Sequence, residues 1–257
     1  MRASRTILLL VSVLLICGCL GSPGEPRPSS DQQALDALNQ SQAALANVTA
    51  YRAQATGSAE MTDDDRQVSG GMDTDVRVNV STQEVKSTTR IEDPSFPVDS
   101  VRDLYITEYT VYSECRLTGW GQRNLSEEQP WFAYTPIGGE VAVLDRAPVY
   151  WRGTDRLDGT ETAVIVAHPT EEELQAIPNT WSLDAENPDG ARLQNATLTV
   201  WLDTETWLPV QIHRETSWRT GGADVSLTTT WRFDAYDEPT VIERPSFDAS
   251  EIRESGC

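Results

Sequence analysis

The sequence of 257 residues predicts an α+β domain, in which a curved antiparallel sheet carries an N-terminal helix. From Tyr51 onward, apolar and polar residues alternate in segment after segment, which is typical of strands with one dry and one wet face. Residues 31–48 instead have apolar residues at helical spacing. Because a sheet of nine or more strands curls, we expect a strongly curved wall.

The N-terminal helix is predicted over about residues 31–48. No Gly or Pro interrupts this stretch, and its apolar stripe consists of Leu35, Leu38, Leu45 and Val48. Ser30 and Gln33 have the form of a capping box. Two shorter helical turns are expected later in the chain, one at residues 126–129 and one that begins at a second capping box, Thr170 to Glu173, and ends before Pro178.

The strongest strand signal is a hairpin over residues 197–214, with its turn at residues 203–206. A further strand follows Gly221 and Gly222. Weaker alternation marks three more strands, at residues 76–80, 105–111 and 164–166. Strands with one polar and one apolar side predict an antiparallel sheet that faces water on one side.

The N-terminus has the features of a secretory signal. Arg2 and Arg5 precede a ten-residue, mostly apolar run, which is too short to span a membrane as a helix. Residues 16–18 before Cys19 resemble the lipobox of secreted lipoproteins, which implies removal of residues 1–18 and a lipid on Cys19. The alternatives are an ordinary signal peptide or an uncleaved anchor.

Three regions follow from this interpretation. Residues 1–18 are the signal peptide, residues 19–29 are a Pro-rich tether behind the lipidated Cys19, and residues 30–257 form a single domain. We therefore expect the protein at the outer face of the cell membrane, held there by the lipid on Cys19. Since one acyl chain anchors a protein only marginally, the lipid is expected to have two chains.

The chain is strongly acidic. Forty Asp and Glu oppose twenty Lys and Arg, for a net charge of -20, which argues against nucleic-acid binding. Lys86 is the only lysine, and an acidic excess with arginine in place of lysine resembles the proteins of salt-loving archaea. The acidic stretches lack the ligand spacing of a calcium loop, so solvated turns explain them better than calcium binding.

The sequence lacks the common catalytic and metal-binding motifs. His168 and His213 are its only histidines and lie far apart, and neither a zinc motif, a nucleophile elbow nor a phosphate-binding loop is present. We therefore predict a protein without enzymatic activity, metal or cofactor. Among so many carboxylates a catalytic pair can arise by accident, so a carboxylate-dependent hydrolase stays an alternative.

Two cysteines remain beside those of the signal region. Cys115 and Cys257 are predicted to form a disulfide, because thiols outside the cell tend to pair. The alternative is two unlinked thiols.

The order of elements and the hairpin resemble the LolA/LolB and LppX-type lipoprotein-carrier superfamily. In that group a strand ending in Trp-x-Asp leads through a Thr-containing turn to Leu-Pro and an apolar strand, and the matching residues here are Trp201, Asp203, Thr206, Leu208 and Pro209. The resemblance implies an incomplete β-barrel with the helices on its concave face and an apolar cavity between them. Family members hold lipid chains or lipid-modified proteins in this cavity.

By this resemblance, the expected function is binding of an apolar ligand, a lipid or a lipid-modified protein, by a membrane-anchored extracytoplasmic lipoprotein. The alternation of apolar residues nominates the cavity lining: Leu198, Val200, Leu202, Val210, Ile212, Leu227, Trp231 and Phe233. The main alternative is a non-catalytic envelope protein with a solidly packed interior that acts through contacts with another protein.

Overall fold

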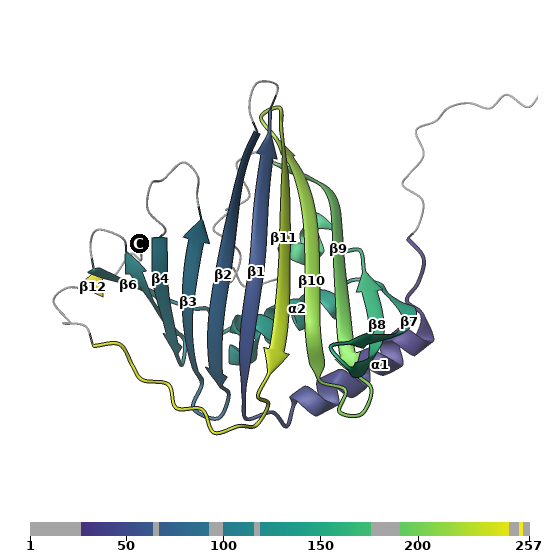
Figure 1. Ribbon diagram of the computed structural model, residues 1–257, viewed down its shortest axis with the longest axis horizontal. Helices are drawn as coiled ribbons and strands as arrows, with labels where there is room; N and C mark the ends of the chain where they lie inside the picture. The colour runs from purple at the N-terminus through teal and green to yellow at the C-terminus, as the bar shows by residue number, and fades with distance from the viewer. Residues whose placement is uncertain are drawn as a thin grey trace, which may run out of the picture.

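The fold is an open, curved sheet with its helices on the concave side, as the computed structural model of the chain shows (Figure 1). The structure describes residues 27–63, 67–92, 100–115, 119–175, 191–246 and 252–253. The predicted signal peptide, Cys19, Cys257 and the side chain of Cys115 lie outside this part, so lipidation and the disulfide stay predictions.

The described strands form one sheet of twelve strands. In chain order they are β1 (Ala50–Thr62), β2 (Gln67–Asn79), β3 (Glu84–Glu92), β4 (Ser100–Thr107), β5 (Thr110–Cys115), β6 (Gly119–Asn124), β7 (Val149–Leu157), β8 (Thr160–Ala167), β9 (Arg192–Asp203), β10 (Pro209–Thr220), β11 (Ala223–Asp234) and β12 (Ile252–Arg253). Their order in the sheet is β12-β6-β5-β4-β3-β2-β1-β11-β10-β9-β8-β7. All neighbours are antiparallel except β12 and β6. The predicted fold class is therefore confirmed.

Four helical segments are found among the described residues: α1 (Gln32–Leu45), the 3₁₀ turn η1 (Trp131–Tyr134), α2 (Pro136–Leu144) and α3 (Glu171–Leu174). Buried residues of α1 and α2 share one hydrophobic core with the sheet, and this core includes the fully buried Tyr51, Ile137 and Leu198. Figure 1 shows β1, β2 and β11 rising beyond both helices. The helices therefore cover only the lower part of the concave face.

The predicted N-terminal helix and the hairpin of β9 and β10 are confirmed, but the first capping box is wrong. Asp31, not Ser30, precedes α1, and it makes no side-chain cap. The Ser30 hydroxyl instead accepts a hydrogen bond from the Val149 amide, and the Asp31 carboxylate accepts one from the Trp151 amide. Both amides lie on β7, the edge strand, whose unpaired N–H groups need partners.

Two further expectations need correction. The series over residues 105–111 is a hairpin, because the chain turns at Glu108, which has a φ of 52°. Residues 126–129 form no helix, whereas α2 follows at residues 136–144 and was not predicted. Its paired glycines lower helix propensity, but Thr135 caps its start by accepting from the Gly138 amide, and Pro136 occupies its first turn.

The convex face has a small core of its own. Residues 235–246 leave β11 and run across the lower ends of the strands toward β12 (Figure 1). Ile242 packs there against Tyr105 and Tyr112, whose strand neighbours Ile106 and Val111 point into the main core. The segment thus buries aromatic surface that the sheet alone leaves in water.

Gly138 gives a direct test of the packing of α2. A Cβ added there lies 1.8 Å from the carbonyl oxygen of Phe132, which is backbone and cannot move aside. We expect Gly138→Ala to lower the free energy of unfolding by about 3 kcal/mol in equilibrium urea denaturation.

Gly57→Ala is the matched control. Its added Cβ meets the flexible end of Met72, 2.9 Å away, so a change below about 1 kcal/mol is expected. Equal stability of Gly138→Ala and the wild type would contradict the described packing of α2.

Candidate functional site

The concave face of the central strands consists of transverse rows of residues that pair across neighbouring strands. The row Ile212, Trp231, Ala55 and Thr74 is buried in the core. The next row toward the upper ends of the strands is Arg214, Thr229, Gly57 and Met72. Met72 and Thr229 are still buried, so this row marks the boundary of the covered core.

Two more rows continue the concave face beyond that boundary, and we call their residues the upper wall. One row is Thr216, Leu227, Ala59 and Gly70, and the other is Trp218, Val225, Met61 and Val68. Met61 is 41% exposed and Val68 36% exposed. The described residues therefore present an apolar concave surface to solvent above α1 and α2.

A cleft of about 270 Å³ lies along this surface. Its lining comes from residues 57–61 of β1, 68–72 of β2, Ile91 and Glu92 of β3, and Val225 of β11. Because Gly57 has no Cβ, the end of the Met72 side chain can lie against its backbone. Methionine side chains are flexible and adapt to apolar partners of different shapes, so the cleft is suited to an apolar group of variable shape.

Most of the residues nominated from the sequence lie deeper than the cleft. Six of them are buried in the main core beneath the helices: Leu198, Val200, Leu202, Ile212, Trp231 and Phe233. Leu227 is half-buried in the upper wall, and Val210 is half-buried at a register shift between β10 and β9. Their contact with a ligand therefore stays a prediction.

Sequence reasoning missed the residues that line the cleft. Met61, Val68 and Met72 continue the alternation of β1 and β2, but Gly57, Gly70 and small polar residues interrupt the apolar signal. The register between the two strands, which pairs Met61 with Val68 and Gly57 with Met72, is what brings the apolar side chains together. Extending the alternation of β1 upward from Ala55 could have identified Met61.

One buried ion pair lies at the lower boundary of the upper wall. Glu140 of α2 has a side chain only 4% exposed, and its Oε1 lies 3.0 Å from Nη1 of Arg214, whose side chain is 16% exposed. The Oε2 atom of Glu140 is buried without a hydrogen-bond partner. Burial raises the pKa of Glu140, and the charge of Arg214 partly opposes this rise.

The described residues contain no group of three or more His, Cys, Asp or Glu side chains that could hold a metal ion. Glu140 is the one fully buried carboxyl among them, so the pair of buried acids that a hydrolase would need is not found there. His213 bonds to Thr230 and Glu215, and His168 lies near Thr197. His213 lies within β10 and His168 directly after β8, and both side chains have these local partners.

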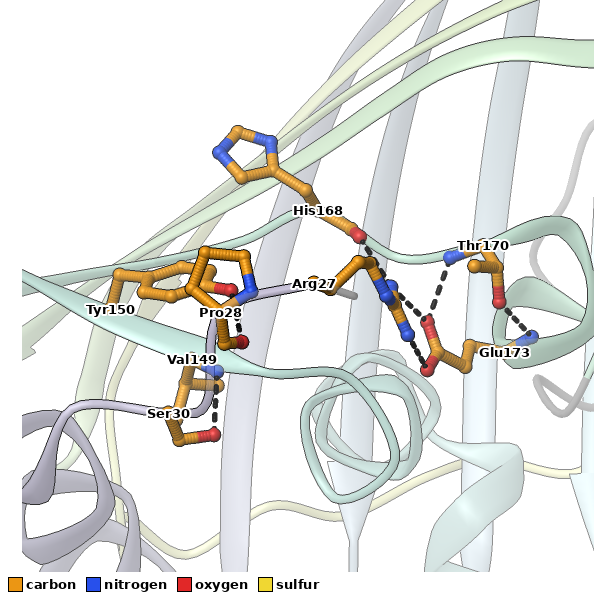
Figure 2. A network of polar contacts seen from close by, with 8 residues as sticks. All are labelled: Arg27, Pro28, Ser30, Val149, Tyr150, His168, Thr170 and Glu173. Carbon is orange, nitrogen blue, oxygen red and sulfur yellow. Dashed lines mark hydrogen bonds and ion pairs between the residues drawn. The ribbon is translucent and has the colours of Figure 1, made fainter. Parts of the chain in front are cut away.

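A second polar cluster fastens the start of the domain to the edge of the sheet (Figure 2). Arg27 donates to both carboxylate oxygens of Glu173, at 2.6 and 3.1 Å, and to the carbonyl of His168. The predicted capping box of α3 is confirmed, since Thr170 and Glu173 exchange hydrogen bonds. The Tyr150 hydroxyl donates to the carbonyl of Pro28. Residues 27–29, expected to belong to the tether, are thus held by the domain.

No helix of the described residues is both long and apolar enough to cross a membrane. No protein-family model matches the chain, and no curated protein matches it. Solved structures do resemble it. The lipoprotein LppX of Mycobacterium tuberculosis is 15% identical, with a TM-score of 0.48 over 83% of this chain and 100% of LppX.

LprF of Mycobacterium bovis is 13% identical, with a TM-score of 0.46 over 86% of this chain and 100% of LprF. A LolA superfamily protein of Nitrosomonas europaea is 10% identical, with a TM-score of 0.29 over 81% of this chain and 94% of its own. These proteins are of the kinds that the sequence resemblance named. At TM-scores below 0.5, the fold assignment rests on the strand order of this chain itself.

The contact between Arg27 and Glu173 predicts how firmly the N-terminal residues are held. The Glu173→Gln variant should exchange the amide hydrogens of Asp31 and Trp151 faster than the wild type, because both amides bond between residues 27–31 and β7. Glu172→Gln is the matched control, since Glu172 is exposed on the same helix. Equal exchange in the two variants would contradict the proposed fastening.

The same contact predicts a pH dependence. The hydrogen bond from Arg27 lowers the pKa of Glu173 below its usual 4.5. The Arg27–Glu173 contact therefore contributes fully to the free energy of unfolding above about pH 4.5. This contribution is lost as the pH falls through the lowered pKa of Glu173. The pair is partly exposed, so the difference in unfolding free energy between wild type and Glu173→Gln should be at most about 1 kcal/mol at neutral pH.

Proposed function

We propose that the protein is a membrane-anchored extracytoplasmic lipoprotein that binds an apolar ligand, the hydrocarbon chain of a lipid or of a lipid-modified protein, against the upper wall. The supporting observation is the apolar concave surface that continues beyond the helices, where Met61 and Val68 are exposed in one cleft. Exposed apolar surface that is concave and contiguous is typical of ligand-binding grooves.

The size and shape of the cleft favour a chain over a compact molecule. Its volume of about 270 Å³ is slightly below the range of roughly 300–1,000 Å³ that holds drug-sized ligands. Its lining includes Gly70, which has no side chain, and Gly57, against which the flexible end of Met72 lies. A hydrocarbon chain lying on the sheet fits these features.

The anchoring half of the proposal is supported by the lipobox resemblance and by the fastening of Arg27. If Cys19 is lipidated, seven residues lie between it and Arg27, and the eight steps along the chain span at most about 30 Å when extended. The contacts of Arg27 and Pro28 would then hold the β7 edge of the sheet nearest the attachment point. The cleft on β1 and β2 would then lie five and six strand positions from that edge.

A fluorescent fatty acid tests ligand binding. We expect the wild type, freed of bound lipid, to bind the probe, and Met61→Gln with Val68→Gln to weaken binding at least about tenfold. Loss of apolar contact at two side chains corresponds to about 1.4 kcal/mol or more. Both positions are exposed, so the fold should tolerate the change.

Val101→Gln is the matched control for this experiment. Val101 is 53% exposed on β4 and does not line the cleft, so the affinity should stay at the wild-type value. Equal weakening by all three substitutions would place binding elsewhere. A protein that carries no lipid in an organic extract and binds neither fatty-acid nor isoprenoid probes would end the proposal.

The second candidate is a non-catalytic envelope protein that uses the upper wall to contact another protein. The observation that favours it is the dense packing beneath the helices, where Leu198, Ile212 and Trp231 are buried in one core. The absence of probe binding together with a folded wild type would support this candidate over lipid binding.

A further inference from the structure

Arg214 lies where the covered core ends and the upper wall begins. On β10 it follows Ile212, which is buried in the core, and precedes Thr216 and Trp218 of the upper wall. Its neighbour on β11 is Thr229, which in turn pairs with Gly57 of the cleft. A positive charge therefore sits at the lower end of an otherwise apolar concave surface.

Within the described part of the chain, Arg214 uses little of its hydrogen-bonding capacity. A guanidinium has five N–H donors, and among the described residues the polar partner of Arg214 is Glu140 at 3.0 Å. The side chain is 16% exposed, so it is largely buried and still partly accessible. A partly desolvated guanidinium with free donors binds oxyanions strongly, because the fork of N–H groups matches two oxygen atoms.

Glu140 is the second residue of this ion pair. Its Oε2 atom is buried without a partner, which is unfavourable for a charged carboxylate. Burial raises the pKa of Glu140, so it takes up a proton more readily than an ordinary glutamate. In the charged form it balances Arg214, whereas in the protonated form it leaves the positive charge of Arg214 uncompensated and offers an O–H donor next to it.

The distances suit an amphiphile. The last row of the upper wall, with Met61 and Val68, lies four residues along the strands from the row of Arg214, which is about 13 Å. The cleft residue Gly57 lies two strands from Arg214, about 10 Å away. A headgroup at Arg214 can therefore place its chain along the upper wall.

We propose that Arg214 binds the oxyanion headgroup, a carboxylate or a phosphate ester, of a ligand whose hydrocarbon chain lies on the upper wall, and that Glu140 occupies Arg214 when the ligand is absent. This inference rests on the proposed function and names its ligand class. The ligand is an anionic amphiphile.

Three probes with the same chain test the proposal: dodecanoate, dodecyl phosphate and dodecanol, each titrated into delipidated protein at neutral pH by calorimetry. We expect both anions to bind at least tenfold more tightly than dodecanol. The tighter of the two anions identifies the headgroup as carboxylate or phosphate. Arg214→Gln should abolish the difference between anions and alcohol, and Glu140→Gln should strengthen anion binding at least threefold.

Arg219→Gln is the matched control. Arg219 lies on the same strand, loses the same charge when substituted, and pairs with Asp224 at the surface, so the preference for anions should persist. Since Arg214→Gln alone leaves Glu140 buried without its partner and can fail to fold, the double variant Arg214→Gln with Glu140→Gln provides a neutral amide pair. It should bind all three probes with similar affinity.

The outcomes separate this inference from the proposed function. Equal binding of all three probes by the wild type would overturn the headgroup site and leave the apolar site standing. A preference for anions that survives in the double variant would also overturn it. Binding of none of the probes would remove the proposed function and the headgroup site with it.

Discussion

The described part of the open sheet has more concave surface than α1 and α2 cover (Figure 1). The strands β1 and β2 have 13 residues each, a length of about 43 Å, whereas α1 with 14 residues and α2 with nine are about 21 and 14 Å long. The helices fill the lower concavity with a dense core, and the strands continue without them. The apolar upper wall, its cleft and the partly exposed Arg214 all lie at or beyond the boundary of the core that the helices cover.

The two ends of the described chain protect parts of the sheet that the helices do not reach. Residues 27–31 supply acceptors to the free amides of β7, and residues 235–246 cover aromatic side chains on the convex face. Edge strands with unpaired amides invite association with other chains. The segment that leads toward the predicted lipid attachment site is thus also part of the folded domain, which couples the position of the domain to its anchor.

Patterns among residues that are close together in the sequence predicted most of the fold, because such patterns can be read without knowledge of the three-dimensional structure. The alternation over the β9–β10 hairpin, the stripe of α1 and the cap at Thr170 are all of this kind. The predictions failed where the local structure depends on residues distant in the sequence. Ser30 binds β7 instead of capping α1. The helix α2 forms despite its glycines because it is buried against the sheet. The ion pair of Glu140 and Arg214 and the cleft likewise depend on register and helix placement, which the sequence does not display.

Methionine methyl NMR tests the central claim most directly, since Met61 and Met72 both line the cleft and Met1 is the only other methionine. The protein, labelled with ¹³C at the methionine and isoleucine methyl groups, is titrated with a fatty acid that has a nitroxide near its chain end. The account predicts strong broadening of the Met61 and Met72 signals, reversed by reducing the nitroxide, and little change at Ile137 and Ile212 in the covered core. Unchanged methionine signals, or stronger broadening at the two isoleucines, would contradict it.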